Sequence, residues 1–206
     1  MSGSIDDALS FFRLSCGLWR SRRSSHHLLH RRAEAGGSTI EVVELERDDP
    51  RLAAIAALHG QDPGGVVGGC RVRWSGSMAW DRAGENHEGE SLFALMPTDP
   101  AGREGLLLRD RGYAETAPVA GRFRMESDDS LVLTTSYETM TSIERFSFAG
   151  PDLRLRTSAV EGLSNTASFC VEVRLAQPDG NGTAGQPPGV PETPAEAKEP
   201  LSPLGW

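Results

Sequence analysis

Two arginines spaced two positions apart give the clearest chemical signal in this sequence. In the run LRLRTS, Arg154 and Arg156 alternate with leucines, and Ser158 follows at the same spacing. A β-strand places residues with this spacing on one face, where successive side chains lie about 7 Å apart. Two guanidinium groups at that distance repel each other unless something anionic lies between them. The pattern therefore indicates either a solvated outer face with surface ion pairs or an interior site for an anionic ligand.

The preceding segment, ERFSF, adds a carboxylate and aromatic rings. On a strand, Glu144, Phe146 and Phe148 share one face. If a hairpin loop spans 149–153, residue 148 pairs with 154, 146 with 156 and 144 with 158, and Glu144 lies on the face of the arginines. A slip of one residue would reverse that arrangement. One carboxylate, two guanidinium groups and aromatic walls suit a flat ligand that carries acidic groups and protonatable nitrogens.

Two tryptophans flank a turn predicted at Ser75-Gly76-Ser77. Trp74 and Trp80 are large aromatic side chains that either fill the core of a β-protein or line a ligand pocket. The residues alone leave these two interpretations open.

The overall charge excludes one class of function and leaves another open. The net charge of -8 argues against a nucleic-acid surface, which must neutralise phosphates. Residues 13–32, however, carry six arginines and no acid, which suits an anionic ligand or an acidic partner. No apolar run approaches the roughly 20 residues of a membrane span. We therefore expect neither a nucleic-acid partner nor a membrane span.

The cysteines and histidines do not form a catalytic or metal-binding pattern. Cys16, Cys70 and Cys170 show no paired spacing and no secretory signal precedes them, so we expect small buried thiols in a cytoplasmic chain. His26 and His27 are adjacent on a strand and point to opposite faces. We expect no metal site.

The elements that must position these residues are mostly strands. Two helices are predicted, one over 4–16 with Ser4 at its start, and one that follows Asp49 as N-cap and Pro50 and stops at Gly60. Alternating segments predict strands at 38–46, 66–74, 77–81, 91–96, 105–109, 113–119, 122–126, 131–137, 143–148, 153–160 and 168–175. Turns are predicted at 74–77, 127–130 and 150–152.

Many short strands joined by tight turns indicate an antiparallel sandwich or barrel. Gly17-Leu18-Trp19, at the start of the first strand after a short helix, resembles the Gly-x-Trp signature of lipocalin-like barrels, in which an arginine lies across the tryptophan. Arg174 is the candidate for that contact. We predict an all-β, antiparallel lipocalin-like (calycin) β-barrel of about ten strands over residues 1–175, with a short N-terminal helix and one additional helix. A Pro/Gly-rich disordered C-terminal tail is predicted over 176–206.

The chain resembles the S/U-type phycobiliprotein lyases, the CpcS/CpeS family, from about residue 11 to 174. The resemblance is carried by WRSRRSSHH at 19–27, GSMAWDR at 76–82, ENH at 85–87, GYAE at 112–115, YETMTSIERF at 137–146 and LRLRTS at 153–158. It implies a calycin barrel that binds a phycobilin, an open-chain tetrapyrrole, as substrate, with no permanently bound cofactor. It also implies thioether attachment of that pigment to a cysteine of an apo-phycobiliprotein subunit, whether of phycocyanin, allophycocyanin or phycoerythrin.

The resemblance also assigns roles to residues. Arg154 and Arg156 hold the two propionates, and Glu144 contacts the pyrrole nitrogens as the catalytic residue. It also implies that Ser158 adds a hydrogen bond and that Trp74 and Trp80 line the pocket. Arg23 and His26 are implied near the mouth of the pocket, and Glu172 as a second carboxylate. The segment 161–165 departs from the family pattern, because it is shorter and less basic, which puts a binding role of that rim in doubt.

The implied reaction uses a thiol of the partner, so none of the three cysteines of this chain need be catalytic. Two other functions compete with it: a non-catalytic bilin carrier or chaperone, and a generic lipocalin-like binder of small apolar ligands. The paired arginines count against the apolar binder. The sequence leaves open whether the pigment is phycocyanobilin or phycoerythrobilin. It equally leaves open whether the protein acts alone, as a homodimer or as a heterodimer with a paralogue.

Overall fold

The computed structural model describes residues 4–78, 87–110, 119–162 and 165–176, without the side chains of 77 and 78. Its helices are α1 (Ala8–Ser15), α2 (Pro50–Leu58) and the short 3₁₀ turn η1 (Pro63–Gly65). Its strands are β1 (Gly17–His27), β2 (Arg32–Leu45), β3 (Gly68–Met78), β4 (His87–Pro97), β5 (Glu104–Arg109), β6 (Gly121–Met125), β7 (Leu131–Ser136), β8 (Met140–Gly150), β9 (Leu153–Gly162) and β10 (Thr166–Arg174).

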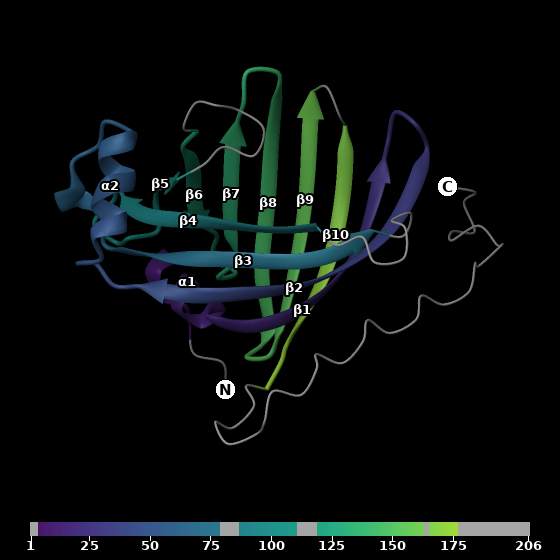
Figure 1. The fold of residues 1–206 in the computed structure, drawn as a ribbon, viewed down its shortest axis with the longest axis horizontal. Coiled ribbons are helices and arrows are strands. Elements are labelled where there is room, and N and C mark those ends of the chain that lie inside the picture. The colour runs from purple at the N-terminus through teal and green to yellow at the C-terminus, as the bar shows by residue number, and fades with distance from the viewer. Residues whose placement is uncertain (1–3, 79–86, 111–118, 163–164, 177–206) are drawn as a thin grey trace.

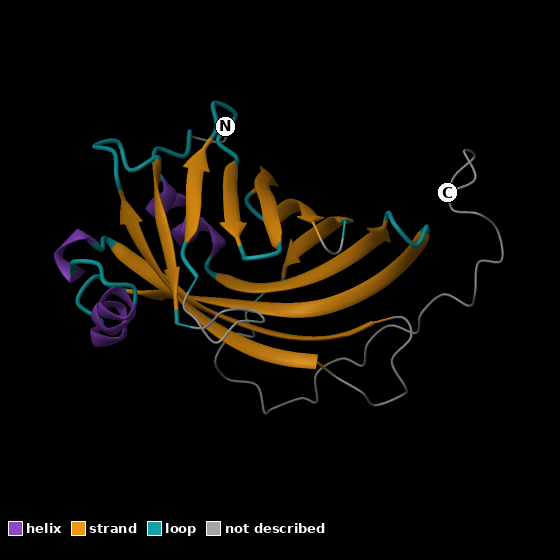
Figure 2. Cartoon of the chain, turned by 90° about the horizontal axis from the view of Figure 1, so that it is seen from above, coloured by secondary structure: helices purple, strands orange, loops and turns teal. Residues whose placement is uncertain are grey.

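The ten strands form one closed antiparallel barrel in the order β1-β10-β9-β8-β7-β6-β5-β4-β3-β2. In Figure 1, β1 to β4 run across the front of the molecule, while β6 to β9 lie behind and cross them. Figure 2 shows the same strands from above, curving around the interior. The predicted fold class, an antiparallel barrel of about ten strands with two helices, is confirmed.

Helix α1 closes one end of the barrel. Its buried Phe11 packs with Leu95, Leu107 and Phe123, which point inward from β4, β5 and β6. The helix begins later than the sequence predicted, because the carboxylate of Asp7 caps it by accepting a hydrogen bond from the Ser10 N–H at 2.7 Å. The predicted start of the helix at residue 4 was therefore wrong by about one turn.

Helix α2 lies on the outside of the barrel, against β4 and β5. Its N-cap Asp49 and first residue Pro50 are those predicted, and Gly60 adopts a left-handed φ of 64° just after the helix ends. Its buried residues Leu52 and Ile55 pack against an outward cluster of β2, β4 and β5. Among the described residues, no helix is both long enough and apolar enough to span a membrane.

The strand predictions hold in part. The turns at 127–130 and 150–152 are confirmed. The turn at 74–77 is wrong, because β3 runs without interruption through this segment and pairs with β2 on one side and β4 on the other. Most of the predicted strands 77–81 and 113–119 lies outside the described residues, as does the predicted disordered tail after residue 176.

The register of the β8–β9 hairpin decides which side chains enter the barrel. Phe148 pairs with Arg154, Phe146 with Arg156 and Glu144 with Ser158. These are the pairs expected from a loop over 149–153, and they confirm that Glu144 and both arginines share one face. That face is the interior, because Arg154 is buried against the ring of Trp19.

Candidate functional site: a charged cluster inside the barrel

Trp19 forms the floor of the barrel interior. It is fully buried, and its indole Nε1 donates a hydrogen bond to the Ser15 carbonyl at 2.8 Å. The guanidinium of Arg174 lies 4.2 Å from the ring centroid, which confirms the predicted stacking contact. Arg174 also donates hydrogen bonds to the carbonyls of Leu14 and Cys16, which the end of α1 leaves without helical partners. One side chain therefore fixes both the helix and the floor.

Gly17 is required by this arrangement. Its φ of 128° lies in the region that favours glycine, and a Cβ at this position would approach Nη1 of Arg174 to 2.7 Å. The glycine of the Gly-x-Trp pattern thus makes room for the arginine that crosses the tryptophan.

Four charged side chains meet above this floor, from β8, β9 and β10. Nε of Arg154 donates to Oε2 of Glu172 at 2.6 Å. Arg156 lies between two carboxylates, with Nη1 at 3.3 Å from Oε1 of Glu144 and Nε at 3.3 Å from Oε1 of Glu172. The second of these contacts lacks hydrogen-bond geometry, so Nε of Arg156 and Oε1 of Glu172 are buried without a hydrogen-bond partner. We call these four residues the interior quartet.

The quartet is electrically neutral, because two guanidinium groups face two carboxylates. Burial lowers the pKa of Arg154, and the attraction of Glu172 opposes that change. Burial also acts to lower the pKa of Arg156, but Glu144 and Glu172 together outweigh it and raise the pKa of that guanidinium. Both arginines therefore stay cationic, and each already has a carboxylate partner.

Only part of the quartet is accessible to solvent. The side chains of Arg156 and Glu144 are 23% and 28% exposed, although both point into the barrel. Arg154 and Glu172 are 6% and 0% exposed. Solvent therefore reaches the first pair, which we call the accessible pair, while the deeper pair is enclosed. A ligand that enters the barrel would meet Arg156 and Glu144 first.

Three further predicted site residues also point inward. Ser158 lies between Glu144 and Ser168 in the sheet. Arg23 is opposite Cys170 on β10, and Trp74 is paired with Gly89 on β4, where a Cβ would overlap the indole ring. The missing side chain of Gly89 thus provides the space that Trp74 occupies.

One predicted site residue among those described, His26, is not brought together with the rest. His26 is exposed on the outer face of β1, next to Ser24, because strand alternation turns it away from Arg23. The expectation that His26 joins Arg23 at the pocket is therefore wrong for its side chain in this structure. Trp80 lies outside the described residues.

Arg109 is an interior residue that the sequence analysis did not single out. It follows the inward-facing Leu107 on β5, and its guanidinium lies 5.3 Å from the centroid of Phe93. The strand 105–109 has leucines on both faces, because Leu108 packs outward under α2 while Leu107 packs inward. Alternation in the sequence therefore could not show which face of this strand points into the barrel, or that Arg109 lies on that face.

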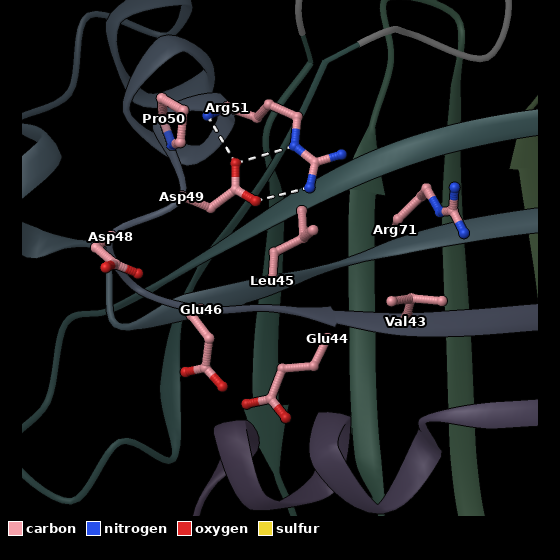
Figure 3. A pocket seen from close by; sticks show the side chains of 9 residues that line it. All are labelled: Val43, Glu44, Leu45, Glu46, Asp48, Asp49, Pro50, Arg51 and Arg71. Carbon is pink, nitrogen blue, oxygen red and sulfur yellow. Dashed lines mark hydrogen bonds and ion pairs between the residues drawn. The ribbon is translucent and has the colours of Figure 1, made fainter.

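A hollow lies on the outside of the barrel, at the start of α2 (Figure 3). It contains four carboxylates, and its two arginines already have partners. Arg51 is bound to Asp49, as the dashed lines show, and Arg71 lies 3.0 Å from Glu41. An acidic hollow of this kind does not match an anionic ligand.

None of the three cysteines is an exposed thiol: Cys70 and Cys170 are buried and Cys16 is half-buried. Burial raises the pKa of the Cys70 thiol strongly, and burial also raises the pKa of Cys16. Cys170 is buried and accepts a weak hydrogen bond from Arg156. In the part of the chain that the structure describes, no group of three or more His, Cys, Asp or Glu residues could hold a metal ion.

A closed antiparallel barrel with a capping N-terminal helix, an arginine-stacked tryptophan floor and a charged interior is a calycin-type barrel. The family model described as "CpeS-like protein" matches residues 7–175. The chain belongs to the CpeS-like family.

Relatives of known description agree with this assignment. A "Chromophore lyase CpcS/CpeS 2" of Paulinella chromatophora is 70% identical over 174 residues, covering 84% of this chain and 88% of that protein. A "Phycocyanobilin lyase subunit CpcS" of a Picosynechococcus species is 55% identical with the same coverage. The solved structure of the S-type phycobiliprotein lyase CPES from Guillardia theta is similar at a TM-score of 0.74 and 32% identity, covering 84% of this chain and 94% of that one.

Proposed function

We propose that this protein is a chromophore lyase that binds a phycobilin inside its barrel and attaches it by a thioether bond to a cysteine of an apo-phycobiliprotein subunit. The observation that carries the proposal is the interior quartet, whose accessible pair presents one guanidinium and one carboxylate. Family membership and the relatives described as chromophore lyases support the reaction. We further propose phycocyanobilin as the pigment, since that pigment is named for one relative that is 55% identical.

The quartet suggests a division of labour. Arg156 reaches a propionate directly, because part of its side chain is accessible. Arg154 and Glu172 act as positioning residues that hold Arg156 and Trp19 in place. Direct contact between Arg154 and a propionate stays a prediction, and it requires Glu172 to release its hydrogen bond. Ser158 adds a hydrogen bond, while Trp74 and Arg23 line the path into the barrel.

Glu144 acts on the reactivity of the pigment. A carboxylate beside the pyrrole nitrogens stabilises their protonated form, which draws electron density from ring A and makes its ethylidene carbon more electrophilic. The thiolate of the partner then forms the carbon–sulfur bond at that carbon. The electron pair of the carbon–carbon double bond moves into the conjugated system, and the proton that the thiol lost returns to the pigment. Binding in one orientation protects the other carbons from attack.

The test is a reconstitution from purified protein, phycobilin and apo-subunit, followed by a denaturing gel stained with zinc. We expect a fluorescent, covalently labelled subunit only when this protein is present. A subunit labelled equally well without it would leave a pigment carrier as the better description. Running the assay with phycocyanobilin and phycoerythrobilin, and with the three kinds of acceptor subunit, identifies the pigment and the partner.

The role of Glu144 is tested by Glu144→Gln. At saturating pigment we expect the rate of attachment to fall on the order of 100-fold, as is typical when a group that controls protonation is removed. The matched control is Glu126→Gln, which removes a carboxylate that is also paired with an arginine, 2.6 Å from Arg124, but on the outer surface. Equal rates of attachment for the two variants would show that Glu144 takes no part in the reaction. A cytoplasmic location and the oligomeric state remain predictions.

A further inference from the structure

The interior quartet leaves a charge unaccounted for. If the ligand is a dicarboxylate pigment, as the proposed function holds, two negative charges must enter the barrel. The quartet offers no net positive charge to receive them, because each of its guanidinium groups already faces a carboxylate. Bringing two uncompensated carboxylates against a neutral cluster would cost desolvation without an equal Coulombic return. The interior therefore needs a cation outside the quartet, and both Arg23 and Arg109 face inward.

Arg109 has the properties of that cation. It lies at the end of β5, and the next inward residue before it, Leu107, belongs to the interior core. Its guanidinium lies over the ring of Phe93 rather than beside a carboxylate. Its Nε is buried without a hydrogen-bond partner, and the described residues supply no ion pair to its side chain. A guanidinium has five N–H donors, so this one retains its capacity to bind an anion.

The position of Arg109 complements that of the quartet. In the closed barrel, β5 is separated from β9 by three strands on one side and five on the other, so the two arginine sites lie on different walls. Both sites rest on the same aromatic layer. Phe93, under Arg109, and Phe148, the strand partner of Arg154, both pack against the cluster that contains Trp19. A flat ligand lying on that layer would have one cationic group at each of two edges.

We infer that Arg109 is a carboxylate-binding residue of the interior, which receives one acidic arm of the ligand while the accessible Arg156 receives the other. This inference rests on the proposed function and specifies how the two acidic groups are divided between opposite walls. Arg109 is half-buried, with its Nε buried and no ion-pair partner among the described residues, and this also has a cost for the fold. Arg109 therefore behaves as a residue kept for binding at the expense of stability.

The experiment compares Arg109→Gln with wild type for two forms of the pigment, free phycocyanobilin and its dimethyl ester. We expect Arg109→Gln to weaken binding of the free acid about 10- to 100-fold, the usual range for a hydrogen bond to a charged group. Binding of the ester, which lacks both negative charges, should change much less. Arg109→Lys should restore part of the affinity for the free acid, because it keeps the charge but not the planar fork.

The matched control is Arg122→Gln, which removes an exposed arginine of the neighbouring strand β6. It should leave both affinities unchanged. Urea unfolding adds a readout that a structural role would not produce: Arg109→Gln should be at least as stable as wild type, because it removes an unpaired charge. Equal weakening of acid and ester, or an unchanged affinity for the acid, would overturn the inference.

The outcome for Arg109 is separable from that of the proposed function. If wild type binds the pigment without attaching it to any apo-subunit, the lyase proposal fails while the acid-to-ester comparison still decides the role of Arg109. If wild type binds neither pigment form, 8-anilinonaphthalene-1-sulfonate, an aromatic anion, becomes the probe. A tenfold or larger loss of its affinity in Arg109→Gln supports the inference. No loss, or no binding by wild type, contradicts it.

Discussion

Replacing Glu172 by glutamine removes the negative charge on which the deeper half of the quartet depends. The carboxylate is fully buried, and its Oε2 lies 2.6 Å from Nε of Arg154. At that distance and an effective dielectric constant of about 20, the Coulombic attraction is about 6 kcal/mol. Part of it is recovered when side chains and water rearrange around the unpaired guanidinium. We therefore expect the free energy of unfolding to fall by about 3–5 kcal/mol, the range found when one partner of a buried ion pair is removed.

The measurement is urea unfolding followed by circular dichroism, with the free energy taken from the midpoint and slope of the transition. The matched control is Glu41→Gln, since Glu41 lies 3.0 Å from Arg71 but the two side chains are 42% and 28% exposed. This surface pair should contribute less than about 1 kcal/mol. Both variants remove a carboxylate from an ion pair with an arginine, so the difference between them reports the burial of Glu172 together with its second contact, to Arg156.

A second variant tests the reason for the loss. Adding Arg154→Met to Glu172→Gln removes the cation together with its partner, and a buried apolar side chain needs no counter-charge. We expect the double variant to be more stable than Glu172→Gln alone. If Glu172→Gln costs no more than Glu41→Gln, or if the double variant is the less stable of the two, the quartet is not the buried electrostatic unit described here.

Two further predictions concern the cap of α2 and the thiols. Asp49→Ala should lower the free energy of unfolding by about 1 kcal/mol at neutral pH, the usual value of an N-cap. The hydrogen bond from Arg51 holds the pKa of Asp49 down to about 2, so this stabilisation is complete above the unfolded-state pKa of about 4 and is lost as the pH falls through 2. The prediction is contradicted if urea titrations show that the free energies of unfolding of wild type and Asp49→Ala differ by the same amount at neutral pH and at pH about 2. Because burial raises the pKa of Cys70, iodoacetamide at pH about 8 should leave this thiol unmodified in the native protein and modify it after unfolding, as intact mass would show. Attachment of pigment should survive the same treatment, since the thiol that reacts belongs to the partner.

The sequence predicted the barrel and the register of its central hairpin well. Period-two alternation in 143–148 and 153–160, with a loop assumed over 149–153, predicted a register that puts Glu144 on the face of the arginines, and the structure has that register. The stacking of Arg174 on Trp19 was also predicted, from the resemblance of Gly17-Leu18-Trp19 to the Gly-x-Trp signature.

The interruption predicted at 74–77 shows where local signals fail. Serine and glycine there suggested a turn, but β2 and β4 pair with both edges of β3 and hold it extended. Interstrand hydrogen bonds on two sides outweigh the turn preference of a few residues. His26 fails for the opposite reason, since a strand that starts at Gly17 fixes its orientation outward whatever its chemistry.

Residue types and spacing alone determined that the chain forms an antiparallel sandwich or barrel and that Arg154 and Arg156 share one face, because alternation along a strand is a local property. Only the tertiary structure decided that Glu172 neutralises the arginines and that Arg109 points inward without a carboxylate partner among the described residues. These facts depend on strands distant in sequence being closed into one barrel. Charge balance inside that barrel is a sum over several strands, and no single segment of the sequence contains it.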